Sequence, residues 1–135
     1  MNLKSWVTTL LAVTILTAGA AASPGPGTWR RALRLYENGM YEEARALFES
    51  MPSDALTEGY AVLCAVKMRT DDYPERFADY RIRYPASTLS GTLHFEHGRI
   101  LFDAGKYRQA ATEFGFVSMD DLGEGELPEY VFKCG

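Results

Sequence analysis

The chain has 135 residues, with 14 Lys and Arg against 18 Asp and Glu, which gives a formal net charge of −4 at pH 7. Its hydrophobic fraction of 47% and charged fraction of 24% are those of a folded globular protein and argue against intrinsic disorder. This length leaves room for one domain and for no second core of any size. An acidic chain lacks the basic surface that phosphate neutralisation needs, so nucleic-acid binding is excluded.

The first 22 residues have the layout of a secretory signal peptide. Lys4 is their only charge, an uncharged and largely apolar run covers residues 6–18, and small residues lead to Ala20-x-Ala22. This layout predicts cleavage after Ala22, with cleavage after Ala20 as the alternative. The apolar run falls short of the roughly 18 residues that span a bilayer, and no cysteine follows that could carry a lipid anchor. We therefore expect an exported protein, either periplasmic or secreted.

The rest of the chain repeats itself. The pattern aromatic-x-x-Gly-x-Tyr-x-x-Ala-x-x-x-Phe occurs twice with identical spacing, ending at Phe48 and at Phe114. A copy between them keeps the tyrosine and the final aromatic residue, with Asp71 at its glycine position and Arg76 at its alanine position. A period of this length is typical of a solenoid of helix pairs. The tyrosines that begin the second helix recur after 32 and 34 residues, at Tyr41, Tyr73 and Tyr107.

The spacing within each unit predicts two helices joined by a tight turn. Gly39 and Gly105 suit a turn that needs a left-handed residue. Ala44 and Ala110 are small enough for two helices to approach closely, whereas Arg76 should disfavour such packing in the middle unit. No alternating run of strand type occurs, so the domain should be all-α. Positions three or four apart should be buried on each second helix: Tyr41, Ala44, Phe48 and Met51; Tyr73, Phe77, Tyr80 and Tyr84; Tyr107, Ala110, Phe114 and Val117.

These residues resemble the tetratricopeptide repeat family, whose 34-residue unit carries a small residue in its first helix, followed by Gly-x-Tyr, Ala and Phe. The resemblance covers residues 26–135 and implies a right-handed superhelical solenoid of antiparallel helix pairs that binds protein or peptide. The link at residues 84–87 is also similar to repeat proteins of bacterial envelopes. The matching structural positions are Ala32, Gly39, Tyr41, Ala44 and Phe48, then Tyr73 and Tyr80, then Gly98, Gly105, Tyr107, Ala110 and Phe114.

The period also predicts how the chain is divided. An apolar helix at the C-terminal end of the pattern has no second helix to pack on, whereas a solenoid usually ends in a polar capping helix. We therefore expect an N-terminal fragment of a longer array, and self-association through this unpaired helix. The expected parts are a signal peptide (1–22), a Pro/Gly junction (23–27), repeat 1 (28–56), repeat 2 (57–90), repeat 3 (91–123), and a linker with the first helix of an incomplete repeat 4 (124–135).

The resemblance further implies an inner, concave groove lined by the first helix of each unit. Stacked aromatic rings with arginines between them would suit an extended peptide. The alternative is that Trp29 and Phe132 pack against neighbouring repeats instead. The expected groove residues are Trp29, Leu33, Tyr36, Met68, Arg69, Phe95, Arg99, Phe102 and Phe132.

The residues that could carry chemistry are few. His94 and His97 lie three residues apart, but zinc needs three or four ligands, so both are expected to pack in the core. Cys64 and Cys134 lie two units apart, too far for a disulfide within the chain. No nucleophile elbow or phosphate-binding glycine loop occurs. We therefore expect a non-catalytic scaffold without metal or cofactor; the alternative is an N-terminal spacer of a larger envelope enzyme or assembly machine.

Overall fold

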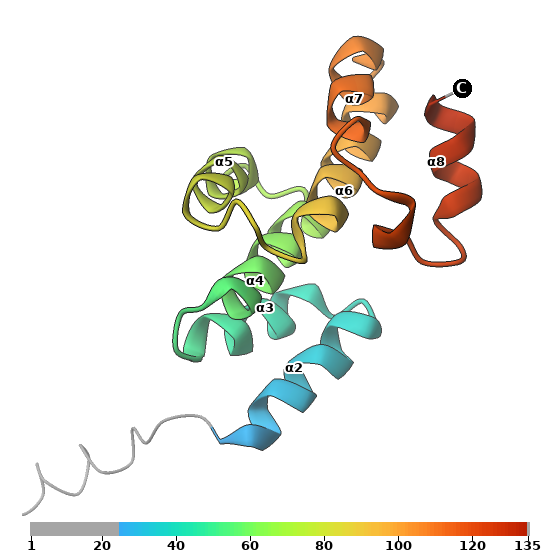
Figure 1. Ribbon diagram of the computed structural model, residues 1–135. Coiled ribbons are helices and arrows are strands. Elements are labelled where there is room, and N and C mark those ends of the chain that lie inside the picture. The colour runs from blue at the N-terminus through green and yellow to red at the C-terminus, as the bar shows by residue number, and fades with distance from the viewer. Residues whose placement is uncertain (1–24, 135) are drawn as a thin grey trace, which may run out of the picture.

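A computed structural model describes residues 25–134, which form helices and no strand, so the prediction of an all-α protein is confirmed. The predicted signal peptide, residues 1–22, lies outside the described residues. In Figure 1, α2 lies at one end of the molecule, and α7 and α8 lie at the opposite end. The helices are α2 (Pro26–Glu37), α3 (Tyr41–Ser50), α4 (Ala55–Met68), α5 (Tyr73–Arg83), α6 (Ser90–Asp103), α7 (Tyr107–Phe114) and α8 (Leu127–Cys134), with a 3-10 helix at Met119–Asp121.

Two of the turns between helices have the same geometry. Gly39 and Gly105 have φ angles of 76° and 75°, so both take the expected left-handed conformation. The amide of Met40 donates to the carbonyl oxygen of Leu35 at 2.8 Å, and the equivalent bond after Gly105 measures 2.9 Å. These bonds close the end of the preceding helix and return the chain along it.

The middle turn, between α4 and α5, is built differently. Arg69, and not Asp71, takes the left-handed conformation, with φ of 53°. The amide of Thr70 donates to the carbonyl oxygen of Ala65 at 3.1 Å, which is the same closing bond. The turn residue therefore comes two positions earlier than expected, and the assignment of Asp71 to the glycine position is wrong. Without glycine, the left-handed conformation carries a steric cost at Arg69.

Small residues lie where the helices of the first and third pairs meet. Ala44 on α3 and Ala110 on α7 are 0% and 1% exposed. On α6, Gly98 lies under the ring of Phe114, so close that an added Cβ would lie 2.5 Å from the Cε1 atom of that ring. Ala32 of α2 is likewise 0% exposed and packs in one cluster with Ala44. The expected role of these small residues in close helix packing is confirmed for α2–α3 and α6–α7.

Most of the predicted stripe on the second helices is buried or half-buried, with one exception. Tyr107 is 62% exposed, so its predicted burial is wrong. It is the first residue of α7 and follows the exposed turn at residues 104–106. The rings of Tyr107 and Phe102 pack edge to face, with their centroids 5.1 Å apart, and the remainder of the Tyr107 side chain faces solvent.

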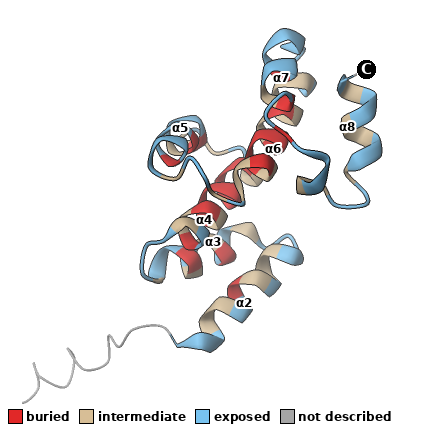
Figure 2. Ribbon diagram, viewed as in Figure 1, coloured by how far each residue is buried: buried red, intermediate tan, exposed pale blue. Residues whose placement is uncertain are grey.

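Helix α4 runs through the middle of the core. All of residues 61–66 are buried, and Figure 2 shows the buried positions continuing from α4 into α6. Tyr36 and Tyr60 pack against both of the clusters in which α4 takes part. A third cluster joins α6 to α7 and includes Phe95 and Phe114, with Tyr130 of α8 packed against it.

We predict that Gly98→Ala destabilises the protein although alanine favours helix. The new methyl group meets the buried Phe114 ring, so the ring or α7 must shift, at a cost of about 1–3 kcal/mol. Gly27→Ala in α2 is the matched control, because a Cβ there meets nothing within 4 Å. The control should gain about 0.5–1 kcal/mol from helix propensity. Thermal unfolding of both variants tests the packing, and an equal rise in Tm for both would contradict it.

Candidate functional site

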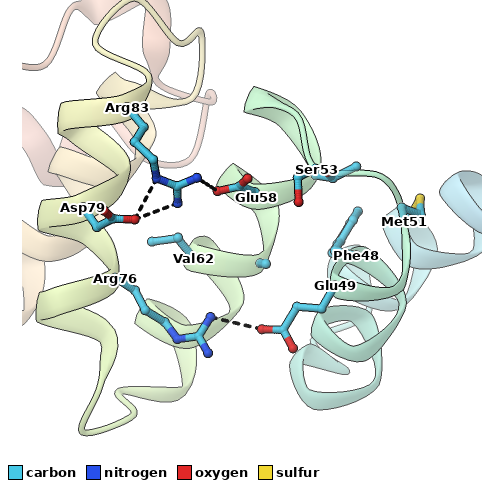
Figure 3. A pocket seen from close by; sticks show the side chains of 11 residues that line it. Phe48, Glu49, Met51, Ser53, Glu58, Val62, Arg76, Asp79 and Arg83 are labelled. Carbon is cyan, nitrogen blue, oxygen red and sulfur yellow. Dashed lines mark hydrogen bonds and ion pairs between the residues drawn. The ribbon is translucent and has the colours of Figure 1, made fainter.

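A groove with a volume of about 450 Å³ lies between α3, α4 and α5. Figure 3 shows it from close by: Phe48 and Glu49 come from α3, Val62 from the middle of α4, and the charged side chains of α5 face them. Its apolar part consists of Phe48, Met51, Ala61 and Val62. Its charged side chains are Glu49, Glu58, Arg76, Asp79 and Arg83.

The groove is explained by the residue at position 76. In the first and third units a buried alanine holds this position, at Ala44 and Ala110. Arg76 is too long and too polar to lie between two helices, and its side chain is 40% exposed. Helices α4 and α5 consequently pack less extensively than α2–α3 or α6–α7. The open space that results lies beside Arg76.

Ion pairs bridge the groove from α5 to the two helices facing it. Arg76 Nη1 lies 3.1 Å from Glu49 Oε1 of α3, and Arg83 Nη1 lies 2.5 Å from Glu58 Oε2 of α4. Arg83 is also held by Asp79 on its own helix, at 2.7 Å. Exposed pairs of this kind stabilise a fold by less than about 1 kcal/mol. A ligand can therefore displace them at little cost to stability.

Asp72 anchors Arg76 from the turn before α5. The hydrogen bond from Thr70, at 2.6 Å, and that from Arg76, also 2.6 Å, hold the pKa of the Asp72 carboxyl well below its usual range. The carboxylate therefore stays ionised through the neutral and mildly acid range. Arg76 in consequence keeps one fixed partner while its Nη1 atom faces Glu49.

The predicted concave row is only partly brought together. Phe95 is 0% exposed and lies between the rings of Phe114 and Tyr130, so its expected place on a groove is wrong. Trp29 packs edge-on to Tyr60 of the second unit, with ring centroids 5.7 Å apart, as the alternative for that residue predicts. Phe132 is 77% exposed. Leu33, Tyr36 and Met68 pack against the cluster shared by α2, α3 and α4.

The charged members of the row, Arg69 and Arg99, do come together on one face, along a smaller groove of about 260 Å³ between α4 and α6. A chain of ion pairs extends from this groove to α8, and Phe102 lies under Lys133 with the Nζ atom 4.8 Å from the ring centroid. The pairs are Lys67–Glu96 (2.5 Å), Arg99–Glu96 (3.3 Å), Arg99–Glu129 (2.9 Å), Lys133–Glu129 (2.7 Å), Lys133–Asp103 (3.5 Å) and Arg69–Asp103 (3.1 Å).

Sequence reasoning missed most of this network. A partial signal for it existed: Arg69 and Asp103 have opposite charges and are 34 residues apart, which is one repeat period, so they should lie near each other on successive units. Key charged side chains of the network are more buried than those of the groove beside Arg76: Glu96 is 7% and Lys133 is 11% exposed, whereas Arg76 is 40% exposed. The α4–α6 face is therefore less available to a ligand than the groove beside Arg76.

The two histidines pack between α5 and the α6–α7 pair, as expected. His94 is 6% exposed, and its Nδ1 atom lies 2.6 Å from Glu113 Oε2. The Nδ1 atom of His97 lies 3.2 Å from the hydroxyl of Tyr73. Both imidazoles also lie edge-on to Phe77, with centroids 5.1 and 5.5 Å away. These contacts attach α5 to the third helix pair.

Within residues 25–134, no three His, Cys, Asp or Glu side chains are grouped so that they could hold a metal ion. No helix in the same range combines the length and the apolar character that crossing a membrane requires.

Comparison of the chain with protein-family models, with curated proteins and with solved structures gives no match. The repeat pattern and the groove beside Arg76 are therefore the features from which a function can be inferred.

We predict that the two thiols differ strongly in reactivity. Burial raises the pKa of the Cys64 thiol to about 12, so it carries almost no thiolate at neutral pH. Cys134 is exposed, and neither cysteine is paired. A thiol reagent should label Cys134 within the native protein and Cys64 only after unfolding in urea. Fast labelling of both in the native state would contradict the burial, and Cys134→Ser should remove the native reaction.

We also predict that acid destabilises the α5 junction. Burial lowers the pKa of His97 below its ordinary value of 6.5, so the unfolded chain takes up this proton before the folded chain does. The free energy of unfolding should therefore fall as the pH drops below about 6.5 and flatten once the folded state is protonated too. Urea unfolding at a series of pH values measures this.

The matched variant for this prediction is His97→Gln, which cannot titrate. It should show a flatter pH dependence than the natural chain between about pH 5 and 7. Glu113 contributes at lower pH: burial raises its pKa, but the hydrogen bond and charge of His94 outweigh burial and leave the pKa below its ordinary value of 4.5. An unchanged slope in His97→Gln would show that another group is responsible.

Proposed function

We propose that the chain is a non-catalytic scaffold of tetratricopeptide type, which binds a segment of a partner protein or peptide in the groove between α3, α4 and α5. The helix pairs would follow a right-handed superhelix, and the protein would act in the periplasm or envelope after export. The open groove with an apolar floor and charged walls is the observation that carries this proposal.

The repeated local geometry supports the scaffold class. Gly39 and Gly105 form the same turn, and the small residues Ala44 and Ala110 lie at the same step of the following helix. Helix α4 packs against α3, α5 and α6, as expected when successive pairs stack on one another. Such arrays present extended surfaces to their partners.

The chemistry of the groove supports a peptide segment as the ligand. A volume of about 450 Å³ falls in the range of small-ligand sites and is enough for a few side chains. An apolar side chain would lie against the half-buried Met51, since Val62 and Phe48 of the lining are already buried. Carbonyl or carboxylate oxygens of the segment would accept hydrogen bonds from Arg76 and Arg83, while its amides would donate to Glu49.

We predict that peptides selected on the purified protein bind through this groove. A phage-displayed peptide library supplies the ligands, and fluorescence anisotropy measures their affinity for the natural chain and for variants. Arg76→Ala restores the small residue of the other units and should let α5 close on α4. It should weaken binding by about tenfold or more. Arg83→Gln, which keeps a shorter polar side chain but removes the charge and the guanidinium group, should also weaken binding.

The matched control is Arg69→Ala, which removes another exposed, ion-paired arginine outside the groove. It should leave the affinity unchanged. Loss of binding in Arg69→Ala with none in Arg76→Ala would move the site to the α4–α6 face and contradict the proposal. A selection that enriches no groove-dependent peptide would favour the alternative, a spacer within a larger envelope enzyme or assembly machine.

A further inference from the structure

Within the described residues, the basic side chains without an ion pair lie on α2 and at the α6–α7 turn. In residues 25–134, every Lys and Arg from 45 to 99 forms an ion pair. Arg30, Arg31 and Arg34 of α2 form none. They are three exposed side chains at spacings of one, three and four residues, so they share one face of the helix. We call this the α2 arginine face.

The segment before α8 carries the opposite charge to the α2 arginine face. The acidic segment, residues 120–126, contains four carboxylates, and no Lys or Arg occurs between residues 109 and 132. Asp121 and Glu126 accept hydrogen bonds from backbone amides of their own loops, at 2.9 Å each. Asp120 and Glu124 are exposed and form no ion pair within the described chain.

Helix α8 follows this segment and leaves one face uncovered. Tyr130 and Lys133 turn toward α6 and α7, where Tyr130 meets Phe114 and Lys133 pairs with Asp103. On the other side, Leu127, Val131 and Phe132 are 37%, 54% and 77% exposed. An uncovered apolar face next to a charged loop is typical of a protein-binding surface.

We infer that the α2 arginine face of one copy docks against the apolar face of α8 and the acidic segment of a second copy. The contact would be heterologous, because the two surfaces lie at opposite ends of the molecule (Figure 1). It would therefore continue from copy to copy, head to tail. This inference is independent of the groove beside Arg76, which lies between the two ends.

The chemistry of the two surfaces is complementary. Guanidinium groups would pair with Asp120 and Glu124, while the aliphatic part of an arginine covers Phe132. The chain already uses such contacts internally: Arg99 lies over Phe95, with its Cζ atom 5.6 Å from the ring centroid. An anionic lipid surface would also attract the α2 arginine face, but the net charge of −4 opposes binding of the whole protein to such a surface. A membrane bound at α2 would also leave the apolar face of α8, at the other end of the molecule, uncovered.

Sedimentation velocity of the full chain over a range of concentrations tests the inference. We expect association at low ionic strength that weakens as salt is added. The head variant Arg30→Glu/Arg31→Glu/Arg34→Glu and the tail variant Asp120→Lys/Glu124→Lys should each weaken association by about tenfold or more. Circular dichroism checks that both remain folded. Lys106→Glu/Arg108→Glu, which reverses two unpaired charges at the exposed α6–α7 turn, should associate like the natural chain.

An equimolar mixture of the head and tail variants gives the sharpest result. The acidic head of one variant then meets the basic tail of the other, and the two unchanged surfaces also match, so association should return. A natural chain that stays monomeric, or a mixture that fails to associate, would overturn the inference. The inference would also be overturned if Phe132→Ser abolished association while neither charge-reversal variant changed it. That result would indicate a symmetric contact between two α8 helices. Binding to anionic vesicles through the α2 arginines by a monomeric protein would assign that face to membrane instead.

Discussion

The close contact between paired helices at a small residue is the constraint on which the rest of the structure depends. Gly98 under the ring of Phe114 shows how little space is left there, since one added carbon atom would overlap the ring. Where the second helix carries alanine, that alanine is buried and the two helices pack closely. Where it carries Arg76, the pair stays open and charged side chains bridge the space. A single difference, arginine in place of alanine, therefore distinguishes the helix pair that borders a groove from the two pairs that pack closely.

Charge follows the same division. In the interior of the chain, from Arg45 to Arg99, each basic side chain has an acidic partner, and the α4–α6–α8 face satisfies its own charges. The groove beside Arg76 also holds ion pairs, but these are exposed and weak, so they fit a ligand that exchanges with them. The α2 arginine face and the side chains of Asp120 and Glu124 form no ion pair within the described residues. On the two proposals above, the middle of the protein would bind a segment of a partner and the ends would contact other copies.

The sequence alone predicts the helices and turns well because both depend on local spacing. The tyrosine period, the glycine turns and the small positions identify which side of a helix faces its neighbour in the pair. They do not identify what covers a residue from further away: Phe95 is buried because Tyr130, 35 positions later, lies across it. The predicted burial of Tyr107 is wrong for the opposite reason. Its ring packs edge-on to Phe102, but no later segment covers it and the residue stays exposed. For the groove, the sequence predicts only that Arg76 disfavours close packing. The depth of the groove depends on how far α5 lies from α4, which the sequence pattern does not give.

Tyr60 gives the protein a property that its separate clusters would not have. Its ring stacks on Phe48 with centroids 5.1 Å apart, lies edge-on to Trp29 and Tyr36, and packs against the clusters on both sides of α4. In a linear array each unit normally contacts only its neighbours, so units can melt one after another. A ring that belongs to two clusters couples their loss. The first two helix pairs should therefore melt as one cooperative unit, while α8, which is held mainly by Glu129, Tyr130 and Lys133, can detach before them.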